Sequence, residues 1–170
     1  IRALELFAGV GMLCEGVRVA FRLLGADYRT ICYVEREAPA AAQLVTLMEA
    51  GALDQAPIWS DIRTFDGAAW RGSVDIVVGG FPCQDISFAG RRAGLDGARS
   101  GLFFNILRVA EDCNAQWIFL ENVEEGELEE RAVARVLGEL SDRGWDAEWI
   151  TLSASDVGAS HRRARWFCLA

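Results

Sequence analysis

Short apolar runs alternate along the chain with segments whose apolar residues recur every three or four positions. The runs Ala3–Phe7 and Tyr28–Val34 predict strands. Between them, Met12–Leu24 has apolar residues at helical spacing and ends at Gly25, so we expect a helix there. By the same criteria, further strands are predicted at Pro57–Ile62, Val74–Val78, Gln116–Leu120, Asp146–Leu152 and Ala164–Leu169, and further helices at Ala38–Ala50, Leu102–Cys113 and Leu128–Arg143.

This alternation of strands and helices predicts the α/β class. Strands linked through helices pair in parallel, so we expect a mostly parallel sheet of seven strands with helices on both faces. The last two strands are joined by a short link and are expected to pair antiparallel. At 170 residues and 52% apolar content, the chain is long enough for a substantial core. We therefore expect a single domain over residues 1–170.

Composition and charge exclude several classes of protein. No apolar stretch approaches the roughly 20 residues of a membrane helix, and no signal peptide is visible. The five scattered cysteines and one histidine lack metal-ligand spacing, so we expect no metal, reduced thiols and a cytoplasmic location. The net charge of −8 is evidence against a protein that binds nucleic acid over its whole surface. A polyanionic partner would have to meet local arginines or a region outside this sequence.

Glycines and chemically active side chains follow the predicted strands, at Gly9, Glu35, Asp61, Cys83 and Glu121. Parallel strands place their carboxyl ends along one edge, where open α/β sheets bind ligands. The turn containing Gly9 and Gly11 lets a ligand approach the backbone at an electropositive helix start. Cys14 stands where a dinucleotide fingerprint has its third glycine, which disfavours pyrophosphate binding. Glu35 suits the hydroxyls of a ribose, and Asp61 suits an adenine amino group.

Cys83 differs from the other cysteines in its surroundings. It lies in the bend Gly79–Gln84, where glycines permit a sharp turn and Pro82 stiffens it. The remaining thiols lie inside apolar runs and are expected to be buried structural residues: Cys14, Cys32, Cys113 and Cys168. A protease-like pair would have to recruit His161. Cys83 is therefore the candidate nucleophile.

Taken together, these segments resemble the catalytic domain of the DNA cytosine-5 methyltransferases. The resemblance runs from about Leu4 to Leu169 in the family's order. The matching segments are Leu6–Gly11, Val34–Glu35, Asp61–Ile62, Gly79–Gln84, Ser87–Gly90, Gly101–Phe103, Glu121–Val123 and Gly158–Phe167. Their most specific elements are Pro-Cys-Gln and Glu-Asn-Val. The resemblance implies the Rossmann-like fold of S-adenosylmethionine-dependent methyltransferases.

The resemblance also implies a reaction. A methyl group passes from S-adenosylmethionine to C5 of a cytosine in DNA, and S-adenosylhomocysteine is the second product. The Cys83 thiolate adds to C6 of a base flipped out of the duplex, and Glu121 protonates or hydrogen-bonds N3. Arg163 and Arg165, two positions apart on a strand, are expected to point to one face, hold the base carbonyl and orient Glu121.

The residues that the resemblance assigns to ligands fall into two groups. Cofactor binding is expected from Phe7, Ala8, Gly9, Gly11, Met12, Glu35, Arg36, Asp61, Ile62, Pro82 and Leu102. DNA contacts are expected from Gln84, Ser87, Arg91, Arg92 and Arg99, in a loop that resembles a closing lid. The implied setting is restriction–modification in a prokaryote or phage, with the protein in the cytoplasm near the nucleoid.

The sequence departs from the family in two places. Ser160-His161 stands where Pro-Gln is usual, and the target-recognition region and two further motifs do not follow. We therefore expect a fragment, one part of a split enzyme with a second chain for recognition, or a reduced protein. In each case the chain alone should bind cofactor weakly and methylate with little sequence specificity. The alternatives are a tRNA cytosine methyltransferase, a non-catalytic binding module and, more distantly, a Rossmann dehydrogenase.

Overall fold

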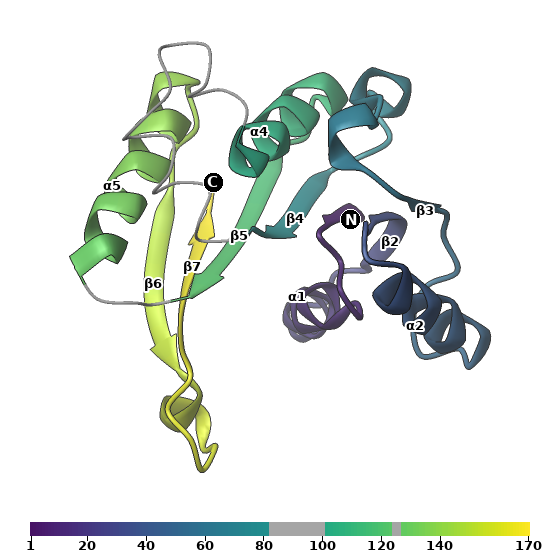
Figure 1. The fold of residues 1–170 in the computed structure, drawn as a ribbon, viewed down its shortest axis with the longest axis horizontal. Coiled ribbons are helices and arrows are strands. Elements are labelled where there is room, and N and C mark those ends of the chain that lie inside the picture. Colours follow the sequence, from purple (N-terminus) through teal and green to yellow (C-terminus); the bar gives the residue numbers. More distant parts are fainter. Residues whose placement is uncertain (82–100, 124–126) are drawn as a thin grey trace. The chain divides into compact units, whose positions relative to one another are not determined.

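The computed structural model describes residues 1–81, 101–123 and 127–170, apart from the side chains of residues 127–132 (Figure 1). The chain divides into two compact units. Unit 1 comprises Ile1–Gly80 and Asn105–Ile118, and unit 2 comprises Phe81–Phe104 and Phe119–Ala170. The expectation of a single domain over residues 1–170 stays a prediction.

A parallel sheet forms the centre of unit 1. Its strands are β1 (Arg2–Leu6), β2 (Arg29–Val34), β3 (Ile58–Trp59) and β4 (Ile76–Gly80), in the order β3-β2-β1-β4. β1 pairs with β2 on one side and with β4 on the other, so that Leu6 is in register with both Val34 and Gly79. The carboxyl ends of these three strands therefore lie side by side.

The helices of unit 1 bury their apolar faces against this sheet. α1 (Met12–Leu23) begins directly after Gly11, and α2 (Ala38–Glu49) has Pro39 in its first turn, where the fixed φ of proline suits a helix start. Leu44 of α2 is fully buried in a cluster with Tyr33 of β2. Most of α4 (Leu102–Cys113) also belongs to this unit. Burial of these apolar side chains is the main force that holds the elements together.

Antiparallel pairing characterises unit 2. Its strands are β5 (Trp117–Val123), of which unit 2 contains the part from Phe119 on, β6 (Glu148–Ser153) and β7 (Ala164–Leu169). β7 pairs antiparallel with both β5 and β6. Side chains alternate between the two faces of a sheet. One face carries the buried Leu120, Trp166 and Cys168, and α5 (Glu127–Asp142) contributes the buried Val136 and Leu140. On the other face Phe119 stacks on Phe167, with ring centroids 6.0 Å apart.

The predicted α/β class is confirmed, with parallel strands in unit 1 and an antiparallel last strand in unit 2. The helix Leu102–Cys113 and the strand Ala164–Leu169 have the predicted bounds. The third strand is shorter than predicted, because Asp61 lies beyond β3 and caps the 3-10 helix η1 (Ile62–Thr64). Two other 3-10 helices, η2 (Gly67–Trp70) and η3 (Ala154–Val157), were not predicted.

Within the three ranges that the structure describes, no helix is both long enough and apolar enough to cross a membrane.

Candidate functional site

The turn from β1 into α1 has an unusual backbone. Phe7, Gly9 and Gly11 have positive φ angles of 56°, 54° and 81°. The Gly11 N–H donates to the Ala8 carbonyl at 2.7 Å, and the Ala8 N–H donates to the Val34 carbonyl at 3.1 Å. Glycine adopts positive φ at little cost, whereas a residue such as Phe7 rarely does. The bond to β2 therefore helps to hold the turn in a conformation that its own sequence only partly favours.

The two glycines of the turn serve different purposes. A Cβ added at Gly9 would meet no heavy atom within 4 Å, so the backbone there borders open space. A Cβ added at Gly11 would lie 2.8 Å from Cδ1 of Leu53 and 3.3 Å from Cδ2 of Leu44. Gly9 thus leaves room for a ligand beside the backbone, whereas Gly11 lets the start of α1 approach the core.

Glu35 follows β2 and connects the turn to the start of α2. Its Oε2 accepts the Gly9 N–H at 2.7 Å, its Oε1 accepts the Glu37 N–H at 2.6 Å, and the residue is 8% exposed. Each oxygen of a carboxylate can accept more than one hydrogen bond. Glu35 can therefore receive the hydroxyl groups of a ligand while it continues to hold the backbone.

Asp61 follows β3 and is paired with Arg63. Its Oδ1 accepts the Arg63 N–H at 3.0 Å, and its Oδ2 lies 2.6 Å from Nη2 of the same arginine. The hydrogen bonds to Arg63 lower the pKa of Asp61 to about 2, and the charge of Arg36 makes a smaller contribution. An ionised carboxylate only accepts hydrogen bonds, which is what the amino group of an adenine requires.

Most of the predicted cofactor residues lie at the carboxyl ends of β1, β2 and β3 in unit 1: Phe7, Ala8, Gly9, Gly11, Glu35, Arg36, Asp61 and Ile62. Met12 begins α1 and is 68% exposed, whereas Ile62 is buried. Leu102, at the start of α4, belongs to unit 2. The roles of these residues in binding stay predictions.

Unit 2 contains an ion pair between Glu121 on β5 and Arg165 on β7. Nε of Arg165 lies 2.9 Å from Oε1 of Glu121, and the two side chains are 20% and 25% exposed, respectively. Nη1 of Arg165 also donates to the Ala164 carbonyl at 2.7 Å. Because the pair is partly shielded from water, salt screens it less than a fully exposed pair. Arg165 and Glu121 thus lie together as an ion pair, and the predicted orienting role of Arg165 stays a prediction.

Two predictions about this region are wrong in detail. β5 continues to Val123, so Glu121 lies inside the strand and not beyond its end. β7 begins at Ala164, and Arg163 precedes it with a φ of 39°. A left-handed residue interrupts the extended alternation of side chains, so Arg163 and Arg165 do not lie two apart on one strand.

The predicted nucleophile, Cys83, lies outside the described residues, as do Pro82 and the predicted DNA contacts Gln84, Ser87, Arg91, Arg92 and Arg99. The other four cysteines are free and buried, as predicted. Burial raises the pKa of Cys32 to about 12 and the pKa values of Cys113 and Cys168 to about 11, and it raises that of Cys14 well above 9.0. A thiol that stays protonated at neutral pH is a poor nucleophile.

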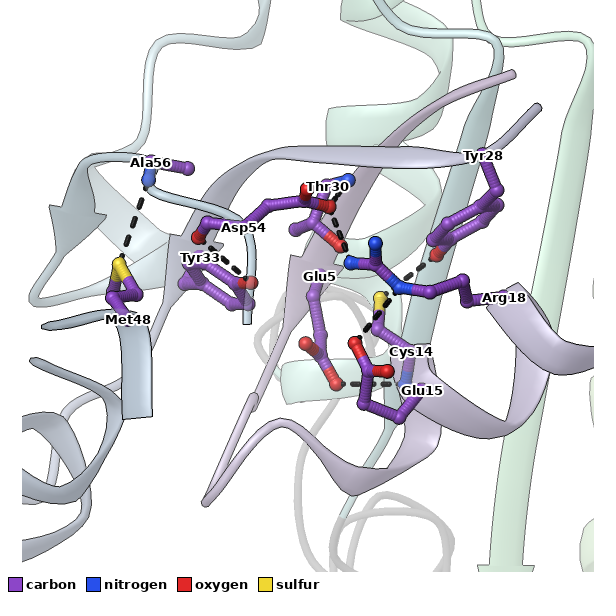
Figure 2. A network of polar contacts seen from close by, with 10 residues as sticks. All are labelled: Glu5, Cys14, Glu15, Arg18, Tyr28, Thr30, Tyr33, Met48, Asp54 and Ala56. Carbon is purple, nitrogen blue, oxygen red and sulfur yellow. Dashed lines mark hydrogen bonds and ion pairs between the residues drawn. The ribbon is translucent and has the colours of Figure 1, made fainter. Parts of the chain in front are cut away.

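The sequence analysis missed Glu5. This residue of β1 is 1% exposed, and its Oε1 accepts the N–H of Cys14 in the first turn of α1 at 3.2 Å (Figure 2). Burial raises the pKa of Glu5 to about 7, although hydrogen bonds with Cys14 oppose the shift. The available signal was a carboxyl side chain within the otherwise apolar run Ala3–Phe7.

Two curated relatives align with nearly the whole chain. The type II methyltransferase M.CviJI of Paramecium bursaria Chlorella virus IL3A is 31% identical over 169 residues, which cover 99% of this chain and 42% of the relative. The type II methyltransferase M2.BsuMI of Bacillus subtilis is 31% identical over 176 residues, which cover 100% of this chain and 42% of the relative. The chain thus spans less than half the length of these relatives.

Solved structures share the fold of the chain. A putative DNA modification methyltransferase encoded within a prophage of E. coli superposes with a TM-score of 0.71 at 21% identity, covering 99% of this chain and 46% of the other. A DNMT2 mutant of Spodoptera frugiperda gives a TM-score of 0.72 at 20% identity, covering 99% of this chain and 49% of the other. The family model of C-5 cytosine-specific DNA methylases matches residues 1–170. On that match, the chain belongs to the C-5 cytosine-specific DNA methylase family.

Proposed function

We propose that this chain is the catalytic part of an enzyme that transfers a methyl group from S-adenosylmethionine to C5 of cytosine in DNA. The match of residues 1–170 to the C-5 cytosine-specific DNA methylases is the observation that carries the proposal. The chain's similarity to type II methyltransferases of a bacterium and a virus supports DNA as the substrate and restriction–modification as the setting. We place the protein in the cytoplasm, where such DNA is found.

The strand ends of unit 1 fit the proposed cofactor. The space beside Gly9 admits a ligand at the backbone, and the start of α1 favours negative charge on that ligand. Glu35 retains acceptor capacity for the ribose hydroxyls, and the ionised Asp61 accepts from the adenine amino group. When bound, S-adenosylmethionine supplies an electrophilic methyl group.

Cys83 is the proposed nucleophile. Its thiolate adds to C6 of the cytosine and forms a C–S bond, which makes C5 electron-rich enough to accept a methyl group. Loss of the C5 proton and departure of the thiolate then restore the ring. The base must leave the duplex to reach the thiol, at a cost of a few kcal/mol in stacking and pairing.

Glu121 and Arg165 assist the addition to C6. Attack at C6 places negative charge on the ring, which a hydrogen bond or a proton at N3 stabilises. Glu121 is the proposed group at N3, where its carboxyl group has to carry the proton that it donates, and Arg165, 2.9 Å from Oε1 of Glu121 in unit 2, is proposed to hold it in place. Arg163, which lies outside β7, is proposed to contact the base carbonyl.

We propose that target recognition depends on residues beyond these 170, in the same polypeptide or in a second chain. The curated relatives are more than twice as long as this chain, which leaves room for a recognition region in those proteins. The 170-residue chain alone is then expected to bind cofactor weakly and to methylate with little sequence preference. A cofactor affinity and site specificity equal to those of a complete enzyme would contradict this part of the proposal.

Mechanism-based trapping tests the proposed reaction. A DNA duplex that contains 5-fluorocytosine has no C5 proton to lose, so methyl transfer should leave the protein covalently attached. We expect an adduct at Cys83 in the presence of S-adenosylmethionine, identified by peptide mass spectrometry, and none with the Cys83→Ser variant. Labelled methyl donor, offered with DNA or with tRNA, reports the preferred substrate. Absence of an adduct, with and without a candidate recognition chain, would favour a non-catalytic binding module.

A further inference from the structure

The start of α1 has no capping side chain of its own. Gly11 occupies the N-cap position and makes no side-chain hydrogen bond, although the first N–H groups of a helix need acceptors from outside it. Cys14, in the first turn, donates its N–H to Oε1 of Glu5 at 3.2 Å (Figure 2). Glu5, on β1, therefore supplies the hydrogen-bond acceptor that the side chain of Ser, Thr, Asp or Asn supplies at the N-cap of many helices.

Because Glu5 is buried, loss of its hydrogen bond to Cys14 would be costly. The residue is 1% exposed, and its Oε2 is buried without a hydrogen-bond partner. Cys14 is held a second time, because its Sγ accepts the hydroxyl of Tyr28 at 2.9 Å (Figure 2). Water cannot replace a lost partner at such a site, so removal of the Glu5 acceptor leaves the Cys14 N–H unsatisfied.

The turn proposed to receive the cofactor lies between Glu5 and Cys14. On the strand side, Ala8 bonds to the Val34 carbonyl and Gly9 bonds to Glu35, at 3.1 and 2.7 Å. On the helix side, the bond from Cys14 to Glu5 ties the first turn of α1 back to β1. Binding groups act only when they are held within a fraction of an ångström, so the helix-side anchor also determines the shape of the turn.

We propose that Glu5 is a positioning residue: its buried carboxyl fixes the first turn of α1 and thereby keeps the Gly9–Gly11 turn in the shape that receives the cofactor. This inference rests on the proposed function, because it takes the turn as the cofactor site. The acceptor oxygen performs this role and the negative charge does not, since a neutral carboxyl or a carboxamide also offers an oxygen to Cys14.

Protonation of Glu5 modulates the anchor. Burial raises its pKa to about 7; hydrogen bonds with Cys14 lower it, and the carboxylates of Glu15 and Glu35 raise it. Three further titratable groups interact with this site, those of Cys14, Tyr28 and Tyr33, and burial raises the pKa of each, which keeps them neutral. Ionised Glu5 places a charge on an unpartnered buried oxygen, so the first turn of α1 should open more readily above pH 7.

Amide exchange at Cys14 tests the anchor in the ligand-free protein. Selective 15N labelling of cysteine yields few signals, because the chain has five cysteines. In Glu5→Ala the Cys14 amide should exchange about tenfold faster than in the wild type, since an unsatisfied buried N–H costs about 1–3 kcal/mol. Cys113 and Cys168, which are buried in other elements, report any general loss of stability. Glu5→Gln should preserve the protection of Cys14 and remove its dependence on pH between 6 and 8.5.

Calorimetry with S-adenosylhomocysteine tests the consequence for the cofactor site. The affinity of Glu5→Ala should be about tenfold weaker than that of the wild type, the factor expected when a positioning hydrogen bond of this strength is lost, whereas Glu5→Gln should stay close to the wild type. Val136→Ala is the matched control, because it removes buried methyl groups from α5 in unit 2 and leaves the turn intact. It should lower stability and preserve the affinity.

The outcomes separate the inference from the proposed function. Unchanged exchange at Cys14 in Glu5→Ala, or equal acceleration at Cys14, Cys113 and Cys168, overturns the positioning role. An affinity loss in Val136→Ala as large as in Glu5→Ala, or a Glu5→Gln variant as impaired as Glu5→Ala, overturns it too. If the wild type binds no S-adenosylhomocysteine but Cys14 exchange responds as expected, Glu5 still anchors α1 and the proposed cofactor site is wrong.

Discussion

Alanine at Gly9 or at Gly11 should separate ligand approach from core packing within a single turn. At Gly9 the φ is +54° and an added methyl group meets nothing within 4 Å, so the cost is that of a left-handed alanine, about 1 kcal/mol. At Gly11 the φ is +81° and the methyl group would lie 2.8 Å from Leu53. Overpacking adds about 1–3 kcal/mol there, so Gly11→Ala should cost about 2–4 kcal/mol in total.

Urea unfolding and calorimetry with S-adenosylhomocysteine measure the two effects separately. Gly9→Ala should unfold close to the wild-type midpoint but bind the ligand weakly, because the methyl group occupies space that the ligand needs. Gly11→Ala should show the larger fall in midpoint, with the slope of the unfolding transition unchanged.

Gly51→Ala is the control for backbone strain alone. Gly51 has a φ of +72° with no atom within 4 Å of an added Cβ, and it lies beyond the end of α2. Its variant should match Gly9→Ala in stability and the wild type in affinity. Equal destabilisation of Gly9→Ala and Gly11→Ala, or full binding by Gly9→Ala, would refute the distinct roles assigned to these glycines.

Three further predictions concern charged groups. The folded state binds the Glu5 proton more tightly than the unfolded chain does, since its pKa is raised from 4.5 to about 7; the unfolding free energy should therefore fall by about 3 kcal/mol as the pH rises from 4.5 to 8. In urea titrations at several pH values, Glu5→Gln should abolish that fall. Plots of unfolding free energy against pH that run parallel for the variant and the wild type would contradict this prediction. The Asp61 carboxyl, with a pKa lowered to about 2, should show little titration above pH 3 in carbon NMR spectra, and Arg63→Gln should raise its midpoint toward 4. Arg165→Gln should slow single-turnover methyl transfer at least about tenfold while stability changes by less than about 1 kcal/mol, because the pair with Glu121 is partly exposed; an unchanged rate would remove Arg165 from the proposed site.

Much of the fold and part of the site were predictable because they depend on local pattern. Helical spacing and a closing glycine were sufficient for α1. A buried apolar run predicted the existence of β4, but the strand is Ile76–Gly80 and not Val74–Val78, so Gly79 and Gly80 belong to the strand and not to the expected bend. Once the strands were assumed to be parallel, their carboxyl ends had to meet. This geometry brought Gly9 and Glu35 together, and the structure places them in hydrogen-bond contact.

The features that could not be predicted depend on tertiary contacts or on single backbone angles. Nothing in the sequence before β7 reveals that Arg163 has a φ of 39°, so the two arginines were expected to share one face although only Arg165 lies within the strand. The end of β3 was misplaced because Asp61 has an extended backbone but uses its side chain to start η1. Glu5 was missed because its partner, Cys14, lies on the following helix, and only packing of α1 on β1 brings them together.

The acidic character of the chain is weaker evidence against a DNA substrate than its net charge of −8 suggests. Glu5 is buried and has a pKa near neutrality, Glu35 directs both oxygens at backbone N–H groups, and Asp61 is neutralised by Arg63. Glu5 and Glu35 are buried, so a sum over the sequence that counts them equally with exposed acids overstates the negative charge at the surface. The pair of Asp61 with Arg63 already cancels in that sum. For this reason the net charge of the chain says little about whether DNA can approach, and DNA contacts from Arg91, Arg92 and Arg99, which lie outside the described residues, stay a prediction.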